Sequence, residues 1–147
     1  MTAAHTNDKP DFSWLLNDFV NKVHGVTHAL IMSSDGFPLT ASRSVSSDEA
    51  EQLAAISSGL LSLAGNSAAL FGKGACEQII MRLTQGYFLF MGIGVGAGLA
   101  VLTGPGADMK VVAYEMTQFV KNAGHALTPE IRADLRRVLT ARRPEPR

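Results

Sequence analysis

The sequence predicts an α/β fold of the α+β type, in which helices cover both faces of a five-stranded, mainly antiparallel sheet. Three observations predict it. The 147 residues alternate between helical and extended patterns in the order α-β-β-α-β-β-β-α, with one more helix at the C-terminus. Short turns join neighbouring strands, as in antiparallel hairpins. The last two strands are apolar on both faces, so helices must cover both, which gives a three-layer sandwich.

Residues 11–42 predict a helix followed by a hairpin. Asp11 is a suitable N-cap, and apolar residues then recur at helical spacing until Gly25. Residues 26–33 form an apolar strand, Asp35-Gly36 is the turn, and residues 37–42 form the returning strand. Pro38 places that strand at an edge of the sheet, because proline lacks the N–H that a central strand donates.

The second predicted helix has no charged face. Ser46 and Glu49 form a capping box that opens it, and the helix continues to about Phe71. No charge occurs in residues 52–72, and small residues dominate. One face should pack on the sheet, while the other favours a close partner, because exposed apolar patches usually mark contacts. Burial within its own domain is the alternative, although a chain this short leaves little to cover that face.

The uncharged stretch 83–107 holds seven of the fourteen glycines. Its length suits a membrane span, but alternating glycines and the Gly-Pro-Gly at 104–106 fit a continuous helix poorly. Residues 92–97 match G-x-G-x-x-A, yet a dinucleotide loop needs a helix after it, and residues 99–103 resemble a strand. A hairpin with strands at 87–94 and 99–103 and a turn at 95–98 fits best. A strand at 76–84 precedes it and is an edge candidate, which invites pairing with another copy.

Two helices close the chain, one capped by Asp108 and one opened by Thr128-Pro129. Residues 128–147 carry six arginines and three acids, whereas residues 1–127 carry seven Lys/Arg and ten acids. We divide the chain into a disordered N-terminus (1–10), a domain (11–126), and a basic helix and tail (127–147). A solvated helix face is the favoured interpretation of the tail, and contact with an acidic partner or a membrane surface is the alternative. The candidate partner contacts are Arg132, Arg136 and Arg137.

No residue pattern indicates an enzyme, a bound cofactor or a metal site. The Gly-Lys-Gly at 72–74 lacks the Ser or Thr that a P-loop needs, and the sequence contains no G-x-S-x-G elbow. His24 and His28 fall on different elements because Gly25 separates them, so they are not a helical metal pair.

The bulk composition predicts a cytoplasmic protein. A single cysteine, Cys76, rules out an intrachain disulfide and suits a reducing compartment. Net charge is zero, so nothing indicates nucleic-acid binding. The N-terminus lacks the basic-then-apolar pattern of a signal peptide, and no membrane span is expected.

The element order and several local motifs resemble the Roadblock/LC7 family. Residues 26–41, with the Asp35-Gly36 turn, are similar to the first hairpin of the family, and G-Y-F-L-F (86–90) leading into L-A-V-L (99–102) is similar to its last two strands. A-D-M (107–109) and V-A-Y-E-M (112–116) resemble the start of the last helix in actinobacterial members. The similarity covers residues 11–126. The glycine-rich turn and the C-terminal arginine helix depart from the family pattern.

The resemblance implies a homodimer in which the second helix and the third strand pair across a two-fold axis. Family members regulate or scaffold small Ras-like GTPases or serve as dynein light chains, and actinobacterial members are associated with a small GTPase and a sensor-kinase-like protein. It therefore implies a non-enzymatic, dimeric regulator or scaffold of a small GTPase in a bacterial signalling complex. The expected interface residues are Leu53, Ala54, Ser57, Ser58, Leu61, Gly65, Ala68, Glu77, Ile79 and Met81.

Two other functions stay open on the sequence. A small-ligand sensor of profilin- or PAS-like architecture would need a pocket with convergent polar groups. The alternating glycines leave space for one, but few polar residues converge there. The second is an assembly scaffold with no nucleotide dependence.

Overall fold

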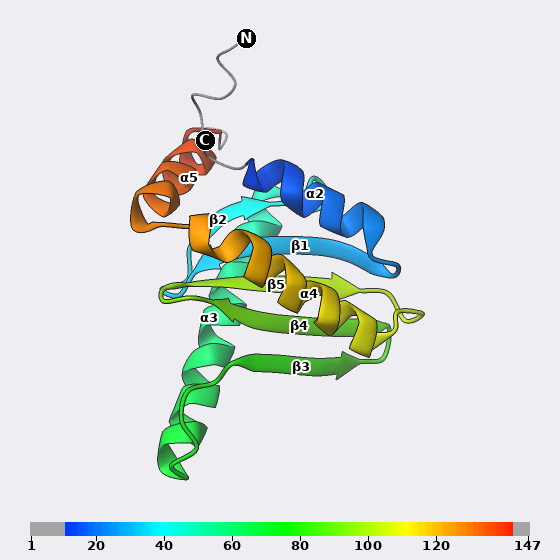
Figure 1. The fold of residues 1–147 in the computed structure, drawn as a ribbon, viewed down its shortest axis with the longest axis vertical. Helices are drawn as coiled ribbons and strands as arrows, with labels where there is room; N and C mark the ends of the chain where they lie inside the picture. Colours follow the sequence, from blue (N-terminus) through cyan, green and yellow to red (C-terminus); the bar gives the residue numbers. More distant parts are fainter. Residues whose placement is uncertain (1–10, 143–147) are drawn as a thin grey trace.

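The computed structural model describes residues 11–142 and has the predicted architecture (Figure 1). The order of helices and strands is confirmed. Residues 1–10, expected to be disordered, and the end of the tail, 143–147, lie outside the described residues. The elements are α2 (Phe12–Lys22), β1 (Val26–Ser33), β2 (Pro38–Ala41), α3 (Ser47–Leu70), β3 (Gln78–Leu83), β4 (Gly86–Ile93), β5 (Ala97–Thr103), α4 (Met109–Ala123), the 3₁₀ turn η1 (Gly124–Ala126) and α5 (Pro129–Arg142).

The five strands form one antiparallel sheet in the order β2-β1-β5-β4-β3. The edge positions of β2 and β3 agree with the sequence analysis. The uncharged stretch 83–107 supplies β4 and β5, so it is not a membrane-spanning helix. Residues 92–97 connect two strands, so they are not the strand-to-helix loop that a dinucleotide requires.

The turn between β4 and β5 is tighter than predicted. It was expected at residues 95–98, but Gly98 pairs with Gly92 inside the ladder. Gly94 and Gly96 adopt φ angles of 54° and 94°, which side chains disfavour, so these two glycines make the turn. Gly98 has a packing role instead, because a Cβ there would lie 2.2 Å from the ring of Phe90.

Each face of the sheet has its own apolar core. Helices α2 and α4 lie across one face and α3 crosses the other, while α5 lies beside β2 (Figure 1). Strand β1 shows the division, since Ala29 and Ile31 join the core beneath α2 and α4, and Leu30 and Met32 join the core beneath α3. Burial on both faces explains the continuous apolar runs in the sequence.

The capping residues act as predicted. The hydroxyl oxygen of Ser46 accepts the Glu49 N–H at 3.1 Å, and the Ser46 N–H donates to the Glu49 carboxylate at 3.0 Å. The backbone hydrogen bond from Ser46 lowers the pKa of the Glu49 carboxyl below its ordinary value. Asp11 and Asp108 cap α2 and α4.

The C-terminal helix packs on the domain. Ile131 and Leu135 of α5 contact the core beneath α2 and α4, and α5 runs beside β2. Leu127, just before α5, is buried in that same core. The expected domain boundary between residues 126 and 127 therefore falls next to a core residue.

Candidate functional site

Helix α3 is longer than the sheet that it crosses. It has 24 residues, which corresponds to about 36 Å at roughly 1.5 Å per residue. The strands span only about 19 Å from β2 to β3, at roughly 4.8 Å per step. The helix runs across the strands, and its C-terminal end continues beyond β3 (Figure 1). That end of α3 therefore has no sheet beneath it.

The outward side of α3 carries an apolar stripe. Ile56, Leu63 and Leu70 have exposed fractions of 56%, 68% and 77%. Their seven-residue spacing keeps them on one side of the helix. No charge occurs in residues 52–72, and only 11% of the most apolar 18-residue window of α3 is buried. An exposed apolar surface of this length is typical of a contact site.

Strand β3 adds an open edge beside the overhanging helix. Among the described strands it pairs with β4 alone, so its outer backbone groups are available to another strand. Ile80 and Leu83 are exposed on it. We call the stripe of Ile56, Leu63 and Leu70 together with the outer edge of β3 the α3–β3 surface.

The expected interface residues divide by burial. Ala54 and Ser57 are already buried in the protomer, because they lie on the same side of α3 as Ala50 and face the sheet. Glu77 is exposed. The other seven are half-buried, and four of these border the core beneath α3; the seven are Leu53, Ser58, Leu61, Gly65, Ala68, Ile79 and Met81.

Sequence reasoning missed the most exposed part of this surface. On α3 it selected two leucines and five small residues, some of which face the sheet, and overlooked the larger side chains on the opposite side. The seven-residue spacing of Ile56, Leu63 and Leu70 was the available signal.

The three arginines proposed as partner contacts all interact within the protomer. The Arg132 guanidinium donates to two backbone carbonyls, at 3.2 and 3.3 Å. The guanidinium carbon of Arg136 lies 3.6 Å from the ring centroid of Phe37, a cation–π contact. Arg137 pairs with Asp134 on the same helix. Of the three, Arg137 is the most exposed.

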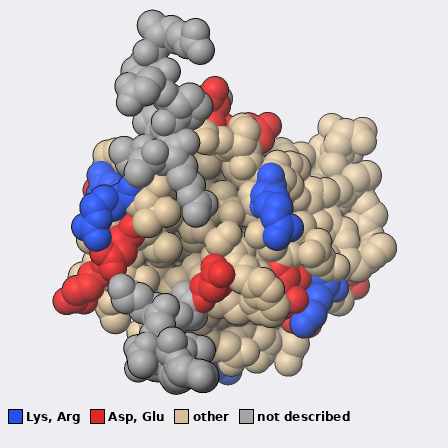
Figure 2. All heavy atoms as spheres, turned by 90° about the horizontal axis from the view of Figure 1, so that it is seen from above, with Lys and Arg blue, Asp and Glu red and all other residues tan. Residues whose placement is uncertain are grey.

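The described residues 11–142 contain no group of three His, Cys, Asp or Glu placed to hold a metal. In the face seen in Figure 2, basic and acidic side chains are interspersed and form no patch of one sign. That face therefore lacks the basic surface that phosphate backbones require.

A hollow of about 560 Å³ lies between α2 and α4. Its apolar lining includes Phe19 and Phe119, whose rings meet edge to face at 5.7 Å. Its polar lining residues are Asp18, Lys22, Glu115, Gln118, Asn122 and His125.

The family model for the Roadblock/LC7 domain matches residues 12–103, which contain α2, α3 and all five strands. The chain belongs to the Roadblock/LC7 family. Helices α4 and α5 of this Roadblock/LC7 protein lie beyond the matched residues. A search of curated proteins finds no significant match.

Solved structures agree with this assignment. A Roadblock/LC7 domain from Streptomyces avermitilis is 34% identical, with a TM-score of 0.75, over 80% of this chain and 98% of that chain. A second Roadblock/LC7 structure from the same organism is 37% identical, with a TM-score of 0.64, over 77% of this chain and 98% of that chain. MglB of Myxococcus xanthus shares the fold at 12% identity, with a TM-score of 0.69, over 86% of this chain and 99% of that chain.

Proposed function

We propose that this Roadblock/LC7 protein is a homodimeric regulator or scaffold of a small Ras-like GTPase that acts through protein contacts rather than catalysis. The observation that carries the proposal is the α3–β3 surface, where the end of α3, which carries no charge after Glu51, overhangs an open strand edge. The resemblance to the family supplies the class of partner, because family members regulate or scaffold such GTPases.

A second copy of the chain suits this surface. A two-fold axis beside β3 would bring each open edge and each overhanging end of α3 against its equivalent, as a self-complementary interface requires. Leu63 and Leu70 would then be covered, and β3 would gain a neighbour. By length and composition alone α3 also meets the requirements of a membrane span. A second copy accounts for the exposed end of α3 while keeping the contact that buries Ala50 and Ala54 against the sheet.

The proposed mechanism is surface complementarity to the switch regions of the GTPase. A protein that binds one nucleotide state more tightly shifts the GTPase towards that state. Arg43 and Arg82 are exposed and available to a partner, but we assign neither of them the role of a trans-acting finger. The proposed setting is a bacterial cytoplasmic signalling complex, with a sensor-kinase-like protein as a further partner.

Capture of partners from native lysate tests whether a small GTPase binds this chain. The immobilised chain is incubated with GDP and, separately, with a non-hydrolysable GTP analogue. We expect a small GTPase to be recovered in one nucleotide state. Because the proposed regulator is the dimer, a Leu63→Glu variant that cannot dimerise should lose the GTPase. Val95→Glu is the matched control, because Val95 is 92% exposed on the β4–β5 turn, outside the α3–β3 surface. Recovery in both states would favour a nucleotide-independent scaffold, and recovery of no GTPase would contradict the proposal.

The hollow between α2 and α4 favours a second candidate, a small-ligand sensor. Its lining combines apolar and polar residues, as ligand sites do. A Phe119→Ala variant would alter the ligand response under this hypothesis and leave GTPase capture unchanged. Thermal shifts of the wild-type chain against a small-metabolite panel distinguish the two functions.

A further inference from the structure

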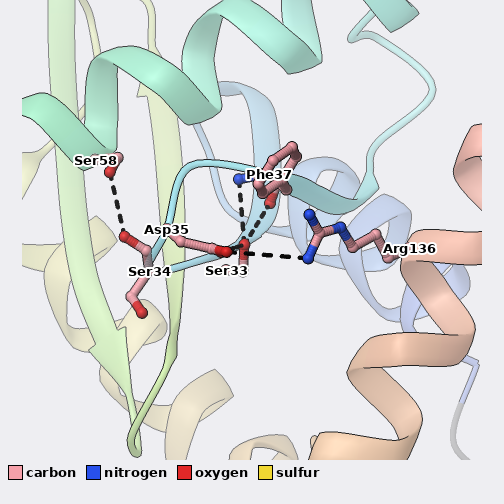
Figure 3. Close-up of polar contacts among 6 residues, drawn as sticks. All are labelled: Ser33, Ser34, Asp35, Phe37, Ser58 and Arg136. Carbon is pink, nitrogen blue, oxygen red and sulfur yellow. Dashed lines mark hydrogen bonds and ion pairs between the residues drawn. The ribbon is translucent and has the colours of Figure 1, made fainter.

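The turn between β1 and β2 is the meeting point of three distant parts of the chain. Within it, the Ser33 hydroxyl donates to the Asp35 carboxylate and accepts the Phe37 N–H, the latter at 3.2 Å (Figure 3). The Ser34 N–H donates to the Gly96 carbonyl at 3.0 Å, so the β4–β5 turn holds it from one side. These bonds fix the position of the turn relative to the sheet.

Helix α5 contacts this turn through one side chain. Arg136 stacks on the ring of Phe37 at 3.6 Å from its centroid, and a guanidinium nitrogen lies 4.0 Å from the Asp35 carboxylate (Figure 3). One turn earlier on α5, Arg132 donates to the Val95 carbonyl at 3.2 Å. Two arginines of α5 thus hold the tips of both hairpins.

Helix α3 contacts the same turn from the opposite side. The Ser58 hydroxyl donates to the Ser34 carbonyl at 3.2 Å (Figure 3). A Cβ on Gly36 would lie 3.4 Å from Ser58 Cβ, in ordinary van der Waals contact, so the turn lies beside the helix. Ser58 lies two residues from Ile56, the first member of the exposed α3 stripe.

We propose that α5 regulates the α3–β3 surface through the β1–β2 turn, and that docking of α5 favours the position of α3 that forms the dimer. The inference rests on the proposed function for the role of that surface. The inference extends the proposed function, because α5 lies outside the residues matched by the family model. Coupling between two sites is reciprocal, so dimerisation also favours docking of α5. A carboxylate-rich partner segment that competes for Arg136 would weaken the dimer by the same path.

The test combines hydrogen exchange with the dimer dissociation constant on the full chain. Arg136→Ala should speed amide exchange in residues 34–37 and 56–61 by about two- to fivefold, the size expected for losing an exposed cation–π contact. The dimer dissociation constant should rise by a similar factor. Arg137→Ala is the matched control, because Arg137 pairs with Asp134 within α5. It should leave exchange in both segments and the dissociation constant unchanged.

A double-mutant cycle separates coupling from a local effect. Ser58→Ala removes the α3 side of the connection, so adding Arg136→Ala to it should no longer change exchange in residues 56–61. Faster exchange confined to residues 34–37 in Arg136→Ala, or an equal response to Arg137→Ala, would overturn the coupling. If the wild-type chain is a monomer, the proposed dimer fails, while exchange in residues 56–61 still decides the coupling.

Discussion

Replacing Gly98 by alanine should destabilise the fold, because a Cβ there collides with Phe90. It would lie 2.2 and 2.4 Å from two atoms of the ring, whereas carbon atoms pack at about 3.5–4.0 Å. Phe90 is 1% exposed within the core beneath α3, so its ring can move aside only by displacing other core residues. Overpacking costs about 1–3 kcal/mol, and a clash of this depth places Gly98→Ala near about 3 kcal/mol.

Urea unfolding at a fixed protein concentration measures this loss, because association makes apparent stability depend on concentration. The melting temperature should fall by roughly 10 °C. Gly92→Ala is the matched control, since Gly92 pairs with Gly98 across the ladder and has nothing within 4 Å of its added Cβ. It should change stability by less than about 0.5 kcal/mol. Phe90→Leu should partly rescue Gly98→Ala. Equal losses for the two glycine variants would refute this account of the packing.

Three further predictions follow from burial and charge. Ser57→Ala should raise the free energy of unfolding by about 1 kcal/mol, because the buried Ser57 hydroxyl has no hydrogen-bond partner within residues 11–142. If urea unfolding instead shows that the free energy of unfolding falls by this amount, the hydroxyl is hydrogen-bonded in the folded protein. The pKa of Glu49 is lowered in the folded state, chiefly by the Ser46 backbone hydrogen bond. The ionised Glu49 carboxylate therefore stabilises the fold above its unfolded pKa, and this stabilisation disappears as pH falls through its folded pKa. The melting temperature of Glu49→Gln should thus lie below that of the wild type at about pH 7 and match it at about pH 2, and a pH-independent gap would be inconsistent with this. A chain ending at Ala126 loses buried Leu127 and the half-buried Ile131 and Leu135, and should be less stable by about 3–4 kcal/mol; an unchanged urea midpoint would show that α5 is independent of the core.

Short-range signals made most elements predictable. The caps at Asp11, Ser46 and Asp108 act within one helical turn, and the Asp35-Gly36 turn is equally local. The strand order could not be derived in this way, because β1 pairs with β5 some 70 residues later: Leu30 faces Ala100. Some glycines of the β4–β5 hairpin form its turn, and another packs against an aromatic ring. Which glycine has which role depends on the position of that ring in the neighbouring strand.

The proposed contact surface includes only some of the residues that the sequence analysis expected at an interface. The absence of charge in residues 52–72 indicated a contact face on the second helix. The overhang depends on the width of the sheet, which no local pattern reveals. The sheet-facing side of α3 could not be assigned from small residues alone, so Ala54 and Ser57 were expected at the interface although both are buried in the protomer. The contact between Arg136 and Phe37 joins residues about a hundred positions apart and left no local signal.

The most direct test of the α3–β3 surface is the mass in solution, by sedimentation equilibrium at micromolar concentration. The wild type should have twice the 15.6 kDa mass of the chain. A variant with Leu63→Glu and Leu70→Glu should have the monomer mass, because two charges on each side would be buried at the interface. Val95→Glu should remain a dimer. A wild-type monomer, or a dimer that survives both α3 substitutions, would contradict the proposed interface.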